Sequence, residues 1–175
     1  IDDEERIWIG TNNKGINVLD NKYRKFDTYQ KNIFDIYSLP DNDVTCFTED
    51  SNGNIWMGTD GGGLCIFIPE SKKIIIPSEC KLTNNAVQRI ICDSEDNLWV
   101  GSWGGGIDKL NPGGKKIRNY KLENDLGFGN NNIMEIFYDS KGVIWAGTAG
   151  SGVFIYNKPL DTFIPIKTIS NSLVL

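Results

Sequence analysis

The stretch D-S-N-G-N-I-W-M-G-T-D-G-G-G-L, residues 50–64, decides the fold because its centre recurs along the chain. The copies are I-W-I-G-T at 7–11, L-W-V-G-S at 98–102 and I-W-A-G-T at 144–148, and the four tryptophans are 48, 43 and 46 residues apart. Each tryptophan has an acid six residues before it, a glycine two after it and a glycine seven after it. In chain order these residues are Trp8, Trp56, Trp99 and Trp145, the acids Asp2, Asp50, Asp93 and Asp139, the near glycines Gly10, Gly58, Gly101 and Gly147, and the far glycines Gly15, Gly63, Gly106 and Gly152.

Each copy predicts four short antiparallel strands. In the second copy they are residues 44–49, the tryptophan strand, residues 64–68 and a weaker strand at 73–76. Residues 50–53 and 139–142 have the Asp-first, Gly-fourth pattern of type I turns. The third copy lacks that glycine, and we expect Asn97 to take the left-handed position. No segment has a helical period, and four strands per 43–48 residues is the size of a propeller blade. We therefore expect an all-β propeller of about four blades, with residues 1–175 as one segment.

The repeated residues have expected structural roles. A buried indole removes about 150–250 Å² from water, which is worth roughly 4–6 kcal/mol, so each tryptophan is expected to pack between neighbouring blades. The near glycine leaves room for the next blade, and the far glycine supplies a positive φ in a hairpin. A ring of ligand-stacking tryptophans is the less favoured alternative, because a ligand site rarely repeats in every unit.

Composition limits the possible functions. The 175 residues are 39% hydrophobic and 23% charged, as in a folded domain or a piece of one. The longest apolar runs are about three residues, whereas a membrane helix needs about 20. The net charge of −5 argues against a nucleic-acid partner. The chain starts with Ile1 and an acidic run rather than a signal peptide, so we expect a piece of a larger protein.

The chain contains no histidine. Its absence excludes Ser-His-Asp and Cys-His catalysis, a phospho-accepting histidine and histidine-ligated zinc within these residues. We therefore expect no metal or other cofactor. The four cysteines show no C-x-x-C spacing and are expected to be free, although export would permit one disulfide. They are Cys46, Cys65, Cys80 and Cys92.

Residues 50–64 resemble the two-component regulator propeller repeat, and so do L-T-N-N-A-V at 82–87 and N-N-N-I at 130–133. The resemblance covers essentially the whole chain. It implies the periplasmic sensor region of a hybrid two-component protein of the Bacteroidetes type, in which two propellers precede an immunoglobulin-like domain, a membrane helix, a histidine kinase and a response regulator. It further implies signal transduction in response to glycan fragments, in a segment that is not itself an enzyme. WD-repeat, kelch and quinoprotein signatures are absent.

Two other functions stay open. One is a propeller enzyme resembling the streptogramin lyases, which depend on histidine and metal. The other is a purely structural propeller that carries protein contacts. Turnover of a candidate substrate would support the enzyme, and a glycan array would separate a sugar-binding module from a scaffold.

Residues that break the repeat are the candidates for ligand binding. Trp103 has no counterpart, since its slot holds Asn12, Asp60 and Ala149 in the other copies, and it is expected to be exposed in a hairpin tip. It is either a platform for a sugar ring or a side chain packed on the glycine patch. Asn12, Asn13 and Asp60 are expected on the same face, as donors and acceptors for hydroxyl groups.

Three further residues interrupt the apolar pattern of the predicted first strands. Cys46, Arg89 and Glu135 each stand two positions after the first strand residue. They point toward the central channel, or Arg89 and Glu135 form an ion pair. Tyr37, Tyr120 and Phe128 are expected in loops between strands.

The first blade is expected to be incomplete. The chain begins at a tryptophan strand, and residues 170–175 resemble the start of another blade, so they could supply the missing strand of blade 1. Closure of four blades is strained, whereas an open arc exposes a blade face. We therefore expect the remaining blades of a larger propeller, or a second copy in a homodimer, as partners.

Overall fold

The computed structural model describes residues 1–166 apart from residues 21, 23, 124–128 and 130. The described chain forms antiparallel sheets in which each strand pairs with the next along the sequence. Each sheet is one blade. Blade 1 contains β1 (Arg6–Gly10), β2 (Ile16–Asp20) and β3 (Lys25–Tyr29), and blade 2 contains β4 (Val44–Glu49), β5 (Ile55–Thr59), β6 (Gly63–Ile68) and β7 (Lys73–Ile75). Blade 3 contains β8 (Val87–Cys92), β9 (Leu98–Ser102), β10 (Gly106–Leu110) and β11 (Lys116–Tyr120), and blade 4 contains β12 (Ile133–Tyr138), β13 (Ile144–Thr148), β14 (Val153–Asn157) and β15 (Thr162–Pro165).

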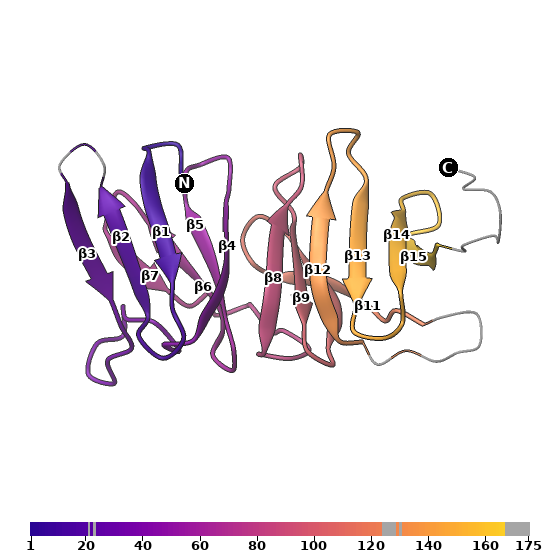
Figure 1. Ribbon diagram of the computed structural model, residues 1–175, viewed down its shortest axis with the longest axis horizontal. Helices are drawn as coiled ribbons and strands as arrows, with labels where there is room; N and C mark the ends of the chain where they lie inside the picture. Colours follow the sequence, from indigo (N-terminus) through magenta and orange to yellow (C-terminus); the bar gives the residue numbers. More distant parts are fainter. Residues whose placement is uncertain (21, 23, 124–128, 130, 167–175) are drawn as a thin grey trace.

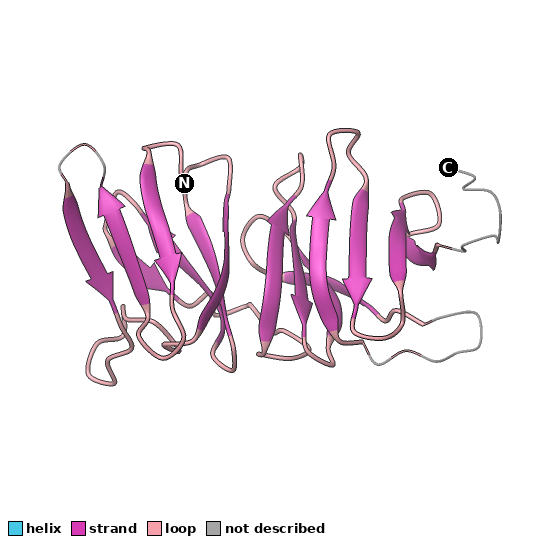
Figure 2. Cartoon of the chain, viewed as in Figure 1, coloured by secondary structure: helices cyan, strands magenta, loops and turns pink. Residues whose placement is uncertain are grey.

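The blades follow one another in an open row, from blade 1 at the indigo end to blade 4 at the yellow end (Figure 1). The first strands β4, β8 and β12 lie next to one another, as the inner strands of a propeller do. Each has a register irregularity at its second residue, between Val44 and Cys46, Val87 and Arg89, and Ile133 and Glu135. Only strands and loops occur in the described residues (Figure 2), so none of them forms a helix that could span a membrane. The fold is an all-β propeller segment.

The strand predictions are confirmed to within about one residue at each end, but one turn prediction is wrong. In the third copy the left-handed residue is Asp96, with φ of 58°, and not Asn97. Asn97 is buried, its backbone N–H donates to Asp93 Oδ1 at 2.9 Å, and β9 begins at the next residue. Blade 1 has three strands among the described residues, and residues 170–175, the predicted fourth strand, lie outside them.

Trp8, Trp56 and Trp99 pack between blades as predicted, whereas no described blade follows Trp145. Trp99 is 1% exposed and lies against Tyr156 of blade 4, with ring centroids 4.7 Å apart. Trp8 makes the same edge contact with Phe67 of blade 2, at 5.0 Å. The near glycines are also explained, since a Cβ at Gly58 would lie 2.5 Å from Val87 and one at Gly101 would lie 2.5 Å from Ile133. The next blade therefore places its first aliphatic residue in a hollow that only glycine leaves open.

The repeated acid has a role that the sequence pattern did not show. Each acid accepts a hydrogen bond from the indole Nε1 of the tryptophan six residues later, at 2.6 Å in blade 1 and 2.9 Å in the other three. The same carboxylate also accepts backbone N–H groups of its turn, for example from Asn97 to Asp93. One carboxylate, buried in blade 1 and half-buried in the other blades, thus joins the turn to the indole and fixes the orientation of the tryptophan.

Candidate functional site

The hairpins that follow the tryptophan strands lie on one face of the row, with the loops that connect one blade to the next. Backbone hydrogen bonds join them in sequence. Gly15 donates to Asn42, Gly63 to Asn85 and Gly106 to Asn131, and the far glycine has a positive φ at each of these three positions. Residues 42, 85 and 131 therefore tie each hairpin tip to the loop leading into the next blade. The result is a rigid edge on which the tip residues stand in a row.

Trp103 is exposed in the hairpin tip between β9 and β10, as predicted, with 47% of its surface accessible. Its backbone is held by an N–H bond to the Ala86 carbonyl at 2.9 Å. Asp60, in the preceding hairpin, forms an isolated β-bridge with the same Ala86. The structure thus brings the backbones of Trp103 and Asp60 to the two sides of one residue.

Asn12 and Asn13 occupy the corresponding hairpin of blade 1. Both are exposed, and Asn13 has a left-handed φ of 62°. The Asn13 amide donates to the Asn12 side-chain oxygen. They lie on the predicted face but in the tip that stands two blades away from Trp103, so they belong to the other end of the row.

The inner-strand candidates divide into two kinds. Arg89 Nε donates to Glu135 Oε2 at 2.9 Å across the inner strands of blades 3 and 4, and both side chains are exposed. The predicted ion pair is therefore present. Cys46 does not join them, because it is 8% exposed and its Sγ lies against the Gly58 position. A channel-facing role for Cys46 is wrong, since its side chain belongs to the packing between blades 2 and 3.

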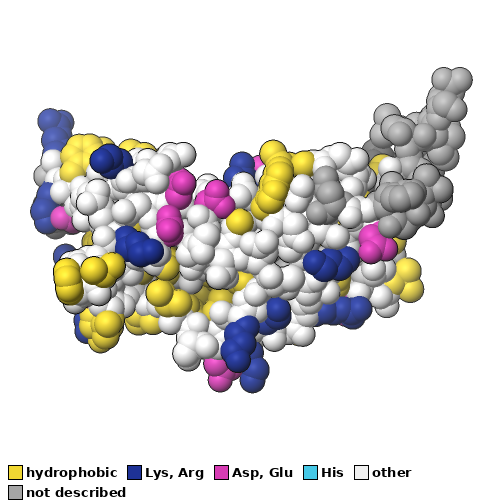
Figure 3. Space-filling view, turned by 90° about the horizontal axis from the view of Figure 1, so that it is seen from below, with side chains coloured by type: hydrophobic (Ala, Val, Ile, Leu, Met, Phe, Trp, Pro, Cys, Tyr) yellow, Lys and Arg dark blue, Asp and Glu magenta, His cyan; other side chains and the backbone are white. Residues whose placement is uncertain are grey.

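The loop from β3 to β4 adds an apolar surface that sequence reasoning missed. Ile33, Phe34 and Ile36 are 82%, 91% and 82% exposed. The run N-I-F-D-I-Y outside the strand frame was the available signal. Figure 3 views the molecule from this side and shows hydrophobic side chains gathered at the blade 1 end.

Of the aromatic residues expected in loops, Tyr37 lies in this same loop, and Phe128 is outside the described residues. Tyr120 is instead the buried last residue of β11, because it packs on Trp99.

The described residues contain few groups that could act as nucleophiles or metal ligands. The four cysteines are free, and burial raises the pKa of the Cys46 thiol to about 11 and that of Cys92 to about 12. Both thiols are therefore protonated and weakly nucleophilic near neutral pH. Within the described part of the chain, no group of three metal-ligating side chains comes together.

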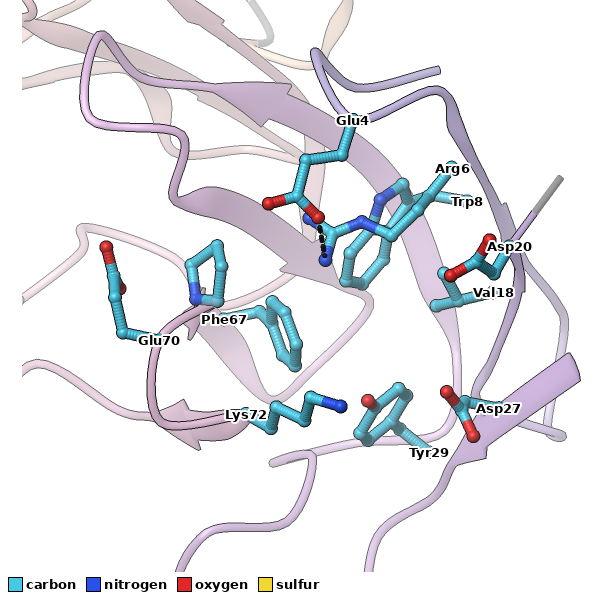
Figure 4. A pocket seen from close by; sticks show the side chains of 11 residues that line it. Glu4, Arg6, Trp8, Val18, Asp20, Asp27, Tyr29, Phe67, Glu70 and Lys72 are labelled. Carbon is cyan, nitrogen blue, oxygen red and sulfur yellow. Dashed lines mark ion pairs between the residues drawn. The ribbon is translucent and has the colours of Figure 1, made fainter. Parts of the chain in front are cut away.

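A second candidate site lies between blades 1 and 2, at the strand ends opposite to the hairpin tips. It is a groove of about 340 Å³ whose walls include Trp8, Tyr29 and Phe67. Charged side chains surround these rings and come from the start of β1, the end of β2, β3 and the turn between β6 and β7 (Figure 4). They are Glu4, Arg6, Asp20, Asp27, Glu70 and Lys72. None of these groove residues was singled out by the sequence pattern except Trp8.

Comparison with known proteins agrees with this architecture. The two component regulator propeller family matches residues 38–61, 81–104 and 127–150, each of which spans a tryptophan strand or the tip after it. No curated protein matches the sequence.

Among solved structures, the extracellular domain of the hybrid two component system BT3049 from B. thetaiotaomicron matches with a TM-score of 0.80 and 24% identity, over 93% of this chain and 22% of that one. The extracellular domain of the hybrid two component system BT4673 from the same organism gives 0.75 and 19%, over 94% and 24%. A catalytically inactive virginiamycin B lyase from Staphylococcus aureus gives 0.70 and 17%, over 97% and 55%.

The chain spans about a quarter of the length of the two extracellular domains, and identities this low carry the fold alone. The chain therefore shares the propeller fold of these extracellular domains of two-component systems. The chain contains repeats of the two component regulator propeller family.

Proposed function

We propose that this chain is a ligand-binding segment of the extracytoplasmic, periplasmic sensor of a hybrid two-component signalling protein, and that it binds oligosaccharide on the hairpin-tip face. The observation that carries the proposal is Trp103, an indole that is 47% exposed on a backbone pinned to Ala86. An ordered side chain loses little conformational entropy on binding, and an aromatic plane suits the apolar face of a sugar ring.

The neighbours of Trp103 supply the polar half of such a site. Asp60 stands on the other side of Ala86 and can accept hydrogen bonds from sugar hydroxyls. Asn12 and Asn13 extend the same edge and can both donate and accept. A chain of several sugar units could contact more than one hairpin tip, because the tips are held in a row.

A glycan array probed with the purified chain, followed by calorimetry on any ligand found, tests the proposal. Trp103→Ala should weaken binding at least tenfold and leave the melting temperature nearly unchanged. Phe34→Ala is the matched control, since Phe34 is an exposed aromatic in another loop. Binding that survives Trp103→Ala would exclude the hairpin-tip site, and binding lost equally in both variants would indicate non-specific adhesion.

In this proposal the segment is not an enzyme and needs no cofactor. A propeller lyase is the alternative, because one structural neighbour is a lyase. The absence of histidine from the sequence argues against it, since the resemblance to that class implies histidine chemistry. Turnover of a cyclic lactone or a sugar by the purified chain would support the lyase.

We further propose that the outward face of blade 4 is covered by another blade of the same repeat. Gly147 repeats the glycine hollow of Gly58 and Gly101, but the nearest described atom to a Cβ there is Glu135 Cβ at 3.9 Å. Trp145 is only half-buried, unlike Trp56 and Trp99. Light scattering on the purified chain tests this: association to about twice the 19.6 kDa mass is expected, and a stable monomer would contradict it.

A further inference from the structure

The groove between blades 1 and 2 has a counterpart between blades 3 and 4. Tyr29 stands 21 residues after Trp8, as Tyr120 does after Trp99, and Phe67 stands 11 residues after Trp56, as Tyr156 does after Trp145. The ring contacts match as well. Tyr29 and Phe67 have centroids 5.5 Å apart at 67°, and Tyr120 and Tyr156 have centroids 5.7 Å apart at 78°. The two interfaces are therefore built from the same positions.

The counterpart groove is closed by a carboxylate of the chain itself. Asp161 Oδ1 accepts hydrogen bonds from Tyr120 Oη and Tyr156 Oη, each at 2.6 Å, and its other oxygen pairs with Arg118. Asp161 belongs to the turn between β14 and β15 and has a left-handed φ of 47°. A separate groove of about 190 Å³ at this interface is lined by Trp99, Tyr138 and Tyr156, and Asp161 does not border it.

Between blades 1 and 2 the turn residue is a cation instead. Lys72 stands 16 residues after Trp56, as Asp161 does after Trp145, and it has the same left-handed conformation, with φ of 54°. Its ammonium reaches into the groove toward Tyr29 (Figure 4), and no described residue forms an ion pair with it. The carboxylate that closes the blade 3–4 groove is thus replaced by a lysine.

A second cation reaches the same space. The Arg6 guanidinium lies 5.6 Å from the centroid of Trp8 and 5.9 Å from that of Phe67. Asp2 accepts from its Nε at 2.7 Å and Glu4 from its Nη1 at 2.9 Å. No described residue is bonded to the Nη2 of Arg6, so this nitrogen can donate to a ligand in the groove.

The opposite rim is acidic. Asp27 lies beside Tyr29 on the side away from Lys72, and Asp20 lies farther along the same rim, next to Val18 (Figure 4); Asp27 also pairs with Lys25 at 2.9 Å. The groove therefore has the cations Lys72 and Arg6, with Glu4 and Glu70 near them, aromatic rings in the middle and acceptors on the opposite rim. Its volume of about 340 Å³ is within the range of small-molecule sites.

We propose that this groove binds a small carboxylate that also carries hydrogen-bond donors. The carboxylate lies next to Lys72, the Tyr29 hydroxyl and Arg6, and away from Asp27, which holds the position of Arg118 at the other interface. The donors face Asp20 and Asp27, and the body of the ligand lies on Phe67 and Trp8. A sugar acid and an α-amino acid share this chemistry, and the test distinguishes them. The site is separate from the hairpin-tip face and does not depend on Trp103.

Calorimetry on the purified chain tests the proposal with sodium D-glucuronate, D-glucose and L-leucine. Glucuronate and glucose differ in the carboxylate. If glucuronate binds and glucose gives no binding heat, the ligand is a sugar acid. Binding of leucine alone supports an amino acid. Binding of neither carboxylate, or equal binding of glucose, overturns the proposal.

Two variants locate the site. Lys72→Gln removes the positive charge and should leave the left-handed backbone at this position unchanged, because lysine and glutamine tolerate it equally. The variant should weaken binding at least about tenfold. Tyr29→Phe removes one donor and should weaken it less. Lys14→Gln, an exposed lysine on the opposite hairpin tip, is the control and should leave affinity unchanged. An unchanged affinity in Lys72→Gln, or a loss in Lys14→Gln of the same size, would overturn the assignment to this groove.

Discussion

The interface between blades 1 and 2 and the interface between blades 3 and 4 use the same positions for different purposes. Both place a tryptophan edge-on against an aromatic residue of the next blade, at 5.0 and 4.7 Å. The second adds Phe163 beside Trp99, and Asp161 accepts hydrogen bonds from the hydroxyls of Tyr120 and Tyr156. The first has Phe67 in place of a tyrosine and Lys72 in place of the acid, and it stays open.

This difference distinguishes the repeated residues that hold the blades together, here called the frame, from positions that vary between blades. The acid, the tryptophan and the near glycine hold the blades together at each interface, because they satisfy buried polar groups and fill the space between sheets. The turn residue 16 positions after a tryptophan is outside that frame. It can close the interface or leave a groove, so one fold carries a fixed scaffold and a site that varies from blade to blade.

The largest expected effect comes from removing the tryptophan of the closed interface. Trp99→Ala should lower the free energy of unfolding by about 3–5 kcal/mol, as large-to-small changes of buried aromatics do. Trp8→Ala should cost about half as much, since Trp8 is only partly buried and borders an open groove. Urea unfolding of both variants measures this. Equal losses would show that the groove does not weaken its interface.

The acid under Trp99 should have the next largest effect. Asp93 is partly buried, which by itself would raise its pKa, but hydrogen bonds from Trp99 and Asn97 outweigh this and lower the pKa below its ordinary value of 3.8. Asp93→Ala strands these donors and should cost about 2–3 kcal/mol. Asp60→Ala, which removes an exposed acid, is the control and should change stability little.

The same pKa shift predicts an acid limit. The contribution of Asp93 is complete well above its ordinary pKa and is lost as the pH falls through 3.8 toward the lower folded value. Asp2 and Asp139 are lowered in the same direction and add to the loss. Thermal melts between pH 7 and pH 2 should show the melting temperature falling below about pH 4. Asp93→Ala should fall less steeply, and an identical pH profile would contradict the assignment.

Exchange of the turn residues tests the comparison directly. Asp161→Asn should cost roughly 1 kcal/mol, because the carboxylate is partly exposed and its bonds are weakened by solvent. Lys72→Asp places a carboxylate beside Tyr29, so it should close the groove and abolish carboxylate binding. Melting temperature and calorimetry read out the two effects. Retained ligand binding in Lys72→Asp would show that the two interfaces are not equivalent.

The frame could be predicted from the sequence, whereas the sites could only partly be. Because each blade repeats the same strands, the fixed spacing of Trp56, Gly58 and Val87 predicts their packing roles. The groove could not be predicted in this way, because Lys72 and Arg6 meet across two blades, 66 residues apart. Arg6 has no counterpart in the other copies, and the position of Lys72 holds Arg24, Lys115 and Asp161 in them. Trp103 could be found because it breaks the repeat. The Asn97 error arose because the repeat marks the place of a turn but not which residue bends left-handed.

The smallest expected effect on stability belongs to Trp103. Its indole is the same group as that of Trp99, but it stands 47% exposed in a hairpin tip instead of 1% exposed between sheets. Trp103→Ala should therefore change the free energy of unfolding by no more than about 0.5 kcal/mol, which is typical of surface substitutions. Trp103→Phe should keep most of any sugar affinity, since it retains an aromatic plane. The measurement is urea unfolding alongside Trp99→Ala under identical conditions. A loss for Trp103→Ala that approaches the loss for Trp99→Ala would assign this side chain to packing on the hairpin glycines and remove the observation on which carbohydrate binding is proposed.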